Sequence, residues 1–186
     1  MKWKVRKSLE ILRDGKTILY PTDTVWGLGC DATNEEAVAR IFTIKKRSES
    51  KSLVILVDSL EMLRNYTEKI PKEVLEILKY SERPTTIIYS SSLGLAKNVI
   101  AKDNTVAIRV VKHNFCKQLI KSFGKPIVST SANISGMPSP QSFKEINKSI
   151  LDAVDYVVNL QLDAIAKTPS KIIKMNKNGG FEVIRD

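Results

Sequence analysis

The chain has 186 residues, a length at which one globular domain buries roughly 70% of its unfolded surface, so we expect a single domain over residues 1–186. Thirty Lys and Arg residues against twenty Asp and Glu residues give a formal net charge of +10. This excess excludes a preference for cationic partners and favours polyanions such as nucleotides, RNA or an anionic surface.

The number and spacing of cysteine, histidine and apolar residues argue against a disulfide framework, a metal site and a membrane span. Cys30 and Cys116 have no paired or metal-ligand spacing, which argues against a disulfide framework and a zinc site. His113 is the only histidine, so a histidine-based metal cluster is excluded and we expect no metal site built by the chain itself. Because no apolar run approaches the roughly 20 residues of a membrane span, we expect a cytoplasmic protein.

The N-terminal segment predicts a helix followed by a strand. Val5, Leu9 and Leu12 fall at helical spacing, and Gly15 is placed to end that helix. The β-branched segment 17–20 then predicts a short strand. The polar residues that come next therefore lie at a strand end.

A turn with small polar side chains follows this strand. Pro21 ends the ladder, and residues 22–24 supply two hydroxyls and a carboxylate, which suit a binding site. Gly27 and Gly29, at alternate positions, allow a tight turn or a ligand against the main chain. For this segment alone, an ordinary Asx or Ser/Thr turn is as well supported.

The second predicted helix ends in a cluster of cations. Thr33 and Glu36 have the spacing of a capping box, and an apolar face follows. Residues 45–47 are Lys, Lys and Arg, and compensation of the helix dipole is enough to explain them in an isolated helix. A polar loop then leads into a strand at 53–57.

The middle of the chain predicts scaffold helices and two strands. Helices open at Asp58 and at Ile70, and strands follow at 85–89 and 105–110. Arg109 lies near the end of the second strand. It is either an exposed residue of an edge strand or an arginine held at a sheet end to bind a carboxylate or phosphate with two donors.

A long uncharged loop follows a predicted strand at 126–129. Residues 129–140 carry five hydroxyls and an amide without a charged residue. Such donors, with glycine and proline around them, can form an anion-binding concavity, and a polar turn is the alternative. The other expected elements are a helix from Asn114 to Gly124, a helix capped by Ser142 and Glu145, a strand at 156–158, and a hairpin of residues 171–175 and 181–185.

These elements predict the α/β class, in a single domain with a twisted, mostly mixed or antiparallel open sheet flanked by helices. Residues 27–32 also fit Gly-x-Gly-x-x-Ala, the pattern of a dinucleotide-binding oxidoreductase. A Rossmann strand should run straight into the first glycine, whereas residues 21–24 intervene. A non-catalytic double-stranded RNA or tRNA-binding module is the other alternative, although the twelve aromatic residues do not cluster on one strand.

Four segments occur in the order and approximate spacing of the YrdC-like family: residues 21–29, 45–47, 105–109 and 129–136. The chain resembles that family over nearly its whole length. The resemblance implies a concave ligand-binding face and the synthesis of threonylcarbamoyl-AMP and pyrophosphate from L-threonine, bicarbonate or CO2, and ATP. The product is the activated intermediate for threonylcarbamoyladenosine, which lies beside the anticodon of tRNA.

The resemblance also implies the site residues and partners. Lys45 and Arg47 would be catalytic, and Mg2+ would be carried with ATP. The residues implied for L-threonine are Thr24, Arg109, Ser129 and Ser170, and those implied for ATP are Arg47, Lys51, Thr105, Ser131, Asn133, Ser139 and Arg185. Further implied partners are RNA or tRNA at a basic concave surface and a downstream threonylcarbamoyl transferase. We expect Ala in place of Arg47 or Arg109 to impair catalysis severely without unfolding the chain.

Overall fold

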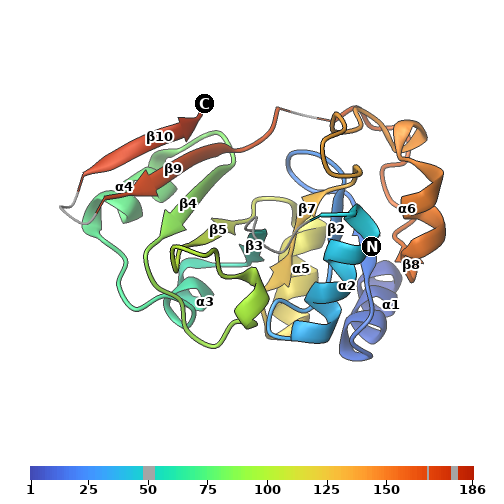
Figure 1. Cartoon of the computed structure of the whole chain (residues 1–186), viewed down its shortest axis with the longest axis horizontal. Helices are drawn as coiled ribbons and strands as arrows, with labels where there is room; N and C mark the ends of the chain where they lie inside the picture. Colours follow the sequence, from blue (N-terminus) through green and yellow to red (C-terminus); the bar gives the residue numbers. More distant parts are fainter. Residues whose placement is uncertain (48–52, 167, 177–179) are drawn as a thin grey trace.

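The computed structural model describes residues 1–47, 53–166, 168–176 and 180–186 (Figure 1). Its strands form a six-stranded and a four-stranded sheet, with helices around them. The predicted α/β class is confirmed, and the single sheet we expected is divided into two. Lys51 and most of the predicted turn between the last two strands lie outside the described residues.

The six-stranded sheet is mixed and places Arg109 in its interior. In spatial order its strands are β10 (Phe181–Arg185), β9 (Lys171–Met175), β4 (Thr85–Tyr89), β5 (Val106–Val110), β3 (Val54–Val57) and β6 (Ile127–Val128). Strand β3 is parallel to β5 and β4 is parallel to β9, while the other pairs are antiparallel. Arg109 pairs with Leu56 on one side and Thr86 on the other, so the edge-strand interpretation of Arg109 is wrong.

The four-stranded sheet joins the larger sheet at Ser129, where the chain turns a corner from one sheet into the other. Its strands are β7 (Thr130–Ser131), β2 (Gly27–Gly29), β1 (Ile18–Tyr20) and β8 (Tyr156–Val157), in that order. Only Ser129 separates β6 from β7, so the chain passes directly from one sheet to the other. The hydroxyl of Tyr20 on β1 donates to the carbonyl of Val128 on β6 at 3.0 Å, which adds a hydrogen bond between the sheets.

The helices bury apolar faces on two hydrophobic clusters. They are α1 (Lys2–Arg13), α2 (Glu35–Lys45), α3 (Leu60–Arg64), α4 (Lys72–Tyr80), α5 (Asn114–Phe123) and α6 (Lys148–Ala153), with 3-10 turns η1 (Lys97–Val99) and η2 (Phe143–Glu145). Leu12 of α1 and Phe115 of α5 share one cluster with Ile18 and Tyr20 of β1. Val38 and Ile41 of α2 belong to the other. No helix in the described ranges is long and apolar enough to cross a bilayer.

The start of α2 differs from the predicted capping box. Asn34 is the N-cap, and its side-chain oxygen accepts a hydrogen bond from the Ala37 amide at 3.1 Å. The hydroxyl of Thr33 donates instead to the buried carboxylate of Asp31 at 2.7 Å. Because Asp31 takes the threonine hydroxyl, the cap moves one residue along the chain.

The helix predicted from Ser142 is interrupted. Ser142 and Glu145 do contact each other at 3.2 Å, but they open only the short turn η2. Helix α6 starts afterwards and is capped by Asn147. Helix α5 ends as predicted at Gly124, whose φ of 75° is in the left-handed region.

Gly27 and Gly29 form strand β2 and not a tight turn. A Cβ on Gly27 would lie 2.9 Å from the Ser129 hydroxyl, and one on Gly29 would overlap the Val128 carbonyl oxygen. Of the two alternatives for these glycines, the tight turn is therefore wrong. Gly29 is required because the main chain of β6 lies directly against β2 there, whereas at Gly27 the neighbouring atoms belong to side chains.

The substitution Gly29→Ala should reduce the free energy of unfolding by about 2 kcal/mol, since the added methyl must push β2 away from Val128. Urea denaturation followed by circular dichroism measures this change. Gly180→Ala is the matched control, because its Cβ would make only an ordinary contact at 3.8 Å with Asn176. Equal unfolding midpoints for the two variants would contradict this packing.

Candidate active site

A cavity of about 400 Å³ brings the predicted site residues together. It is lined by residues of the turn between β1 and β2, by the corner between β6 and β7, and by strands β5, β9 and β10. Eight of the twelve predicted site residues line it: Thr24, Arg47, Arg109, Ser129, Ser131, Ser139, Ser170 and Arg185. Segments more than 150 residues apart in the sequence therefore share one concave site.

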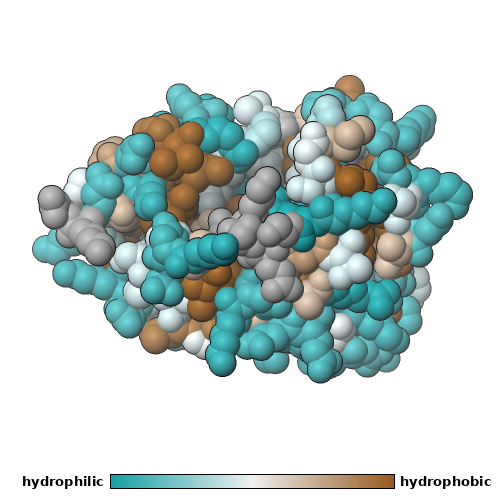
Figure 2. Space-filling view, viewed as in Figure 1, coloured by the Kyte–Doolittle hydropathy of each residue, from teal (hydrophilic) through white to brown (hydrophobic). Residues whose placement is uncertain are grey.

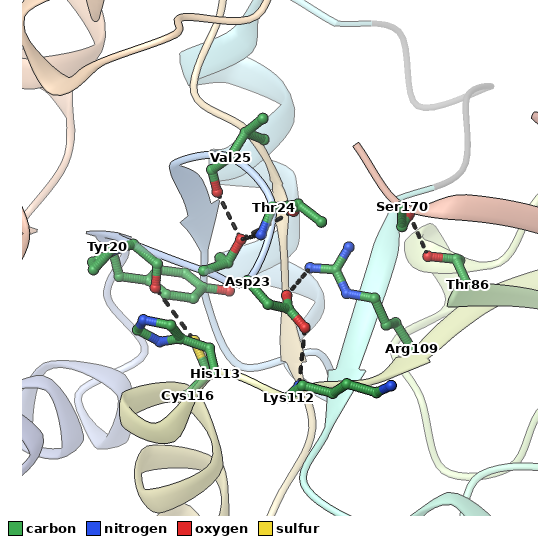
Figure 3. Close-up of polar contacts among 12 residues, drawn as sticks. Tyr20, Asp23, Thr24, Val25, Thr86, Arg109, Lys112, His113, Cys116 and Ser170 are labelled. Carbon is green, nitrogen blue, oxygen red and sulfur yellow. Dashed lines mark hydrogen bonds and ion pairs between the residues drawn. The ribbon is translucent and has the colours of Figure 1, made fainter. Parts of the chain in front are cut away.

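Arg109 is held in the cavity by a buried ion pair with Asp23. The guanidinium Nη2 lies 3.1 Å from Asp23 Oδ1, and the two side chains are 5% and 9% exposed (Figure 3). The other carboxylate oxygen of Asp23 accepts a hydrogen bond from the Lys112 amide at 2.9 Å. Within the described residues, Nε of Arg109 is buried and makes no hydrogen bond. One donor of this arginine therefore has no acceptor among the described residues.

Ser170 lies at the opposite wall, between Thr86 and Arg185. Its hydroxyl is 2.8 Å from that of Thr86, and Figure 3 shows the pair facing each other beside Arg109. The Arg185 guanidinium donates to the Ser170 carbonyl at 2.8 and 3.0 Å. Burial and the nearby Arg109 lower the pKa of Arg185, which shows that cationic groups are concentrated here.

The lining of the cavity is cationic and rich in hydroxyl groups. Arg47, Arg109 and Arg185 contribute guanidinium groups, and burial lowers the pKa of Arg47. Among the described lining residues there is no Asp or Glu. The site is therefore suited to ligands that carry several negative charges.

Lys45 does not line the cavity but supports one of its loops. Its ammonium is 1% exposed and donates to the carbonyls of Ser131 and Asn133, the latter at 2.6 Å. The amide of Asn133 donates in turn to the Met137 carbonyl at 2.6 Å. Lys45 therefore holds the loop that carries Ser131, and Asn133 is part of that loop. Neither residue lines the cavity.

Thr105 also lies outside the cavity lining. It precedes β5, whereas Arg109 is near the other end of that strand. The Thr105 hydroxyl donates to Asp103 at 2.6 Å. This contact explains Thr105 as a local turn residue, and a direct role in ATP binding has no support in the geometry.

A second cavity of about 620 Å³ adjoins the first at Thr24 and Val25, which line both. Its other walls include the side chains of Lys112, His113 and Gln161. The Lys112 ammonium donates to the Ser81 carbonyl, and His113 Nε2 lies 3.1 Å from Gln161. Asp23 and Glu82 also line this larger space, so its described lining is less cationic than that of the smaller cavity.

A family model for Sua5, YciO and YrdC proteins, described as "Telomere recombination", matches residues 10–186. The chain belongs to this family. Its relatives include a protein from Pseudoalteromonas translucida named threonylcarbamoyl-AMP synthase, 34% identical over 94% of each chain. A protein of the same name from Psychromonas ingrahamii is 33% identical over 91% of each chain.

Solved structures of this family have the same fold. Sua5 from Pyrococcus abyssi, in a crystal structure with L-threonine, aligns with a TM-score of 0.84 and 31% identity. The alignment covers 94% of this chain and 52% of that one, so the chain spans about half of the archaeal protein. Escherichia coli YciO has a TM-score of 0.86 over the whole chain at 22% identity, which shows the fold alone.

Two residues of the family motif at 21–29 had no predicted role. Asp23 pairs with Arg109, and Thr22 makes three contacts within the turn. The sequence did carry a signal, because a carboxylate and two hydroxyls at a strand end were recognised as suited to a site. Their partners could not be assigned, since Arg109 is 86 positions from Asp23 in the sequence.

The lowered pKa of Lys45 leads us to expect that the affinity for ATP depends on pH. Burial and Arg47 lower the pKa of Lys45 to about 8, so its ammonium loses a proton as the pH rises through 8 and binds the two carbonyls more weakly. We expect ATP affinity, measured by calorimetry without threonine or bicarbonate, to fall between pH 7 and 9.

In Lys45→Met this dependence should disappear, and affinity should be about tenfold lower at pH 7 because the loop loses its clamp. A parallel pH profile in the two proteins would contradict the role of Lys45.

Proposed function

We propose that this chain is a threonylcarbamoyl-AMP synthase, which forms threonylcarbamoyl-AMP and pyrophosphate from L-threonine, bicarbonate or CO2, and ATP. The observation that supports it most directly is the single cavity in which Arg109, Arg47 and several hydroxyls meet. The curated relatives with this name match almost the full length of the chain. A related archaeal protein has been crystallised with L-threonine.

Arg109 is the group best suited to bind the carboxylate of L-threonine. Its guanidinium is fixed on one side by Asp23 and retains a buried Nε donor without a hydrogen bond in the described part of the chain. A carboxylate that accepts from this donor forms a charge-assisted hydrogen bond and satisfies a group that is otherwise costly to bury. The hydroxyls of Thr24, Ser129 and Ser170 line the same space.

Arg47 and Arg185 are placed to bind the phosphates of ATP, with the hydroxyls of Ser131 and Ser139 beside them. The amine of threonine adds to CO2, loses a proton and becomes a carbamate. A carbamate oxygen then forms a bond to the α-phosphorus, the bond from that phosphorus to the bridging oxygen breaks, and pyrophosphate leaves. In this second step the carbamate, ATP and the departing pyrophosphate are all anions, so the chain accelerates it by positioning them and neutralising their charge.

Magnesium would be held by ATP and not by this chain. In the part of the chain that the structure describes, no three His, Cys, Asp or Glu side chains form a group that could hold a metal. The described cavity walls offer guanidinium groups and neutral hydroxyls but no carboxylate, and a carboxylate is the usual protein anchor for Mg2+. The phosphate oxygens of ATP, and not protein side chains, would therefore bind Mg2+.

The positive charge supports an additional proposal about RNA. A net charge of +10 favours contact with tRNA, and hydrophilic residues cover much of the face in Figure 2. Contact with tRNA would bring the product close to the threonylcarbamoyl transferase that consumes it. Salt-dependent tRNA binding by the folded chain would test this, and no binding at low ionic strength would refute it.

The synthase activity is tested by pyrophosphate release from ATP in the presence of Mg2+ and bicarbonate. We expect release to require L-threonine, to be much slower with L-serine, and to be accompanied by a product with the mass of threonylcarbamoyl-AMP. Release that is independent of threonine in folded protein would contradict the proposed function.

Two arginine variants should separate the two substrates. Arg109→Lys keeps a charge beside Asp23 but cannot bind a carboxylate with two donors, so KM for threonine should rise by about 10- to 100-fold. Arg47→Ala should raise KM for ATP by a similar factor. Arg6→Ala is the matched control, because Arg6 is 82% exposed on α1. Loss of activity in the control, or unchanged KM values in both site variants, would refute these assignments.

A further inference from the structure

The turn between β1 and β2 fixes the direction of a hydrogen bond in the cavity. Thr22 Oγ1 makes three contacts: it lies 2.7 Å from the Val25 carbonyl oxygen, 3.1 Å from the Thr24 amide nitrogen and 3.1 Å from Thr24 Oγ1. Figure 3 shows the contacts that reach Val25 and Thr24. These three partners occupy every hydrogen-bonding position of a hydroxyl, which has one proton and two lone pairs.

Counting protons assigns a donor and an acceptor to each contact. The Val25 carbonyl can only accept, so the one proton of the Thr22 hydroxyl goes there. The Thr24 amide can only donate, so it takes one lone pair of Thr22. The remaining lone pair of Thr22 must accept from the hydroxyl of Thr24, since Thr22 has no further proton to give. The Thr24 proton is thereby used within the turn.

Thr24 consequently offers only lone pairs to the cavity. It is 6% exposed and lines the cavity together with Arg109. A ligand that meets Thr24 must therefore bring a donor. When its carboxylate is bound by Arg109, L-threonine has two such donors, the amine and the side-chain hydroxyl. The amine nitrogen reacts with CO2, and the carbamate that it then carries must extend toward ATP, whereas the side-chain hydroxyl takes no part in the reaction and can stay at Thr24.

We propose that Thr22 is a specificity-determining residue that holds Thr24 as an obligate acceptor for the side-chain hydroxyl of the amino-acid substrate. This inference rests on the proposed threonine-dependent function and adds the reason for selecting a hydroxyl amino acid. An isosteric amino acid without that hydroxyl, such as L-valine, leaves the lone pairs of Thr24 unsatisfied in a buried position. Thr22 acts through Thr24 and does not itself have to touch the substrate.

The test is the ratio of two dissociation constants, that for L-valine divided by that for L-threonine, each measured by calorimetry. Thr22→Val removes the fixed acceptor and should lower this ratio by about tenfold, whereas Thr22→Ser, which keeps a hydroxyl, should restore it. Thr24→Val should abolish the preference for L-threonine. Dissociation constants for ATP and urea unfolding of each variant establish that the turn and cavity are intact.

Each other outcome overturns the inference. If Thr22→Val weakens the binding of L-threonine and L-valine equally, Thr22 is only a structural residue of the turn. If Thr24→Val weakens the binding of both amino acids equally, Thr24 binds the amine that they have in common and not the hydroxyl of L-threonine. If the unaltered chain does not bind L-threonine at all, the proposed function fails too. Binding of L-threonine to the unaltered chain is therefore measured before any variant is made.

Discussion

The buried pair of Asp23 and Arg109 is the interaction on which the site depends. Asp23 lies in the turn of the four-stranded sheet, and Arg109 lies on an interior strand of the six-stranded sheet, so the pair connects the two. Burying both charges is costly, and removing one partner from such a pair typically costs about 3–5 kcal/mol. This changes our expectation for Arg109→Ala: it would leave Asp23 buried without its cation and impair the fold as well as catalysis. Arg109→Lys is the more informative change.

Rigid backbone around this pair positions the other functional groups. The corner at Ser129 belongs to both sheets, Gly29 lets β2 lie against it, and Lys45 holds the following loop by its carbonyls. The hydroxyls near the arginines are therefore carried by backbone that is already ordered. Preorganised donors of this kind stabilise developing charge without the cost of reorientation.

The sequence was sufficient for the fold class and for most of the cavity because both depend on local patterns. Strand ends followed by hydroxyls and glycines marked the turn at 22–24 and the loop at 129–140, and the family resemblance supplied Arg47, Arg109, Ser170 and Arg185. The division into two sheets was not predictable, since it depends on one residue between β6 and β7.

The differences between the expected and the observed contacts have a common physical cause, which is competition between polar partners once the chain is folded. The Thr33 hydroxyl donates to Asp31, so Asn34 caps α2 instead. Carbonyls 86 and 88 positions away bind the Lys45 ammonium, and a catalytic role for Lys45 stays a prediction. Spacing along the chain shows which groups are present. It does not show which of them satisfy each other after folding, and that decides which remain available to a ligand.

The most direct test of this account is a crystal structure of the chain with L-threonine and a non-hydrolysable ATP analogue. We predict that both ligands occupy the cavity of about 400 Å³, with the threonine carboxylate on Arg109 and the phosphates on Arg47. Asp23 should keep its contact with Arg109 in the complex. L-threonine bound instead among Lys112, His113 and Gln161, in the cavity of about 620 Å³, would contradict the account.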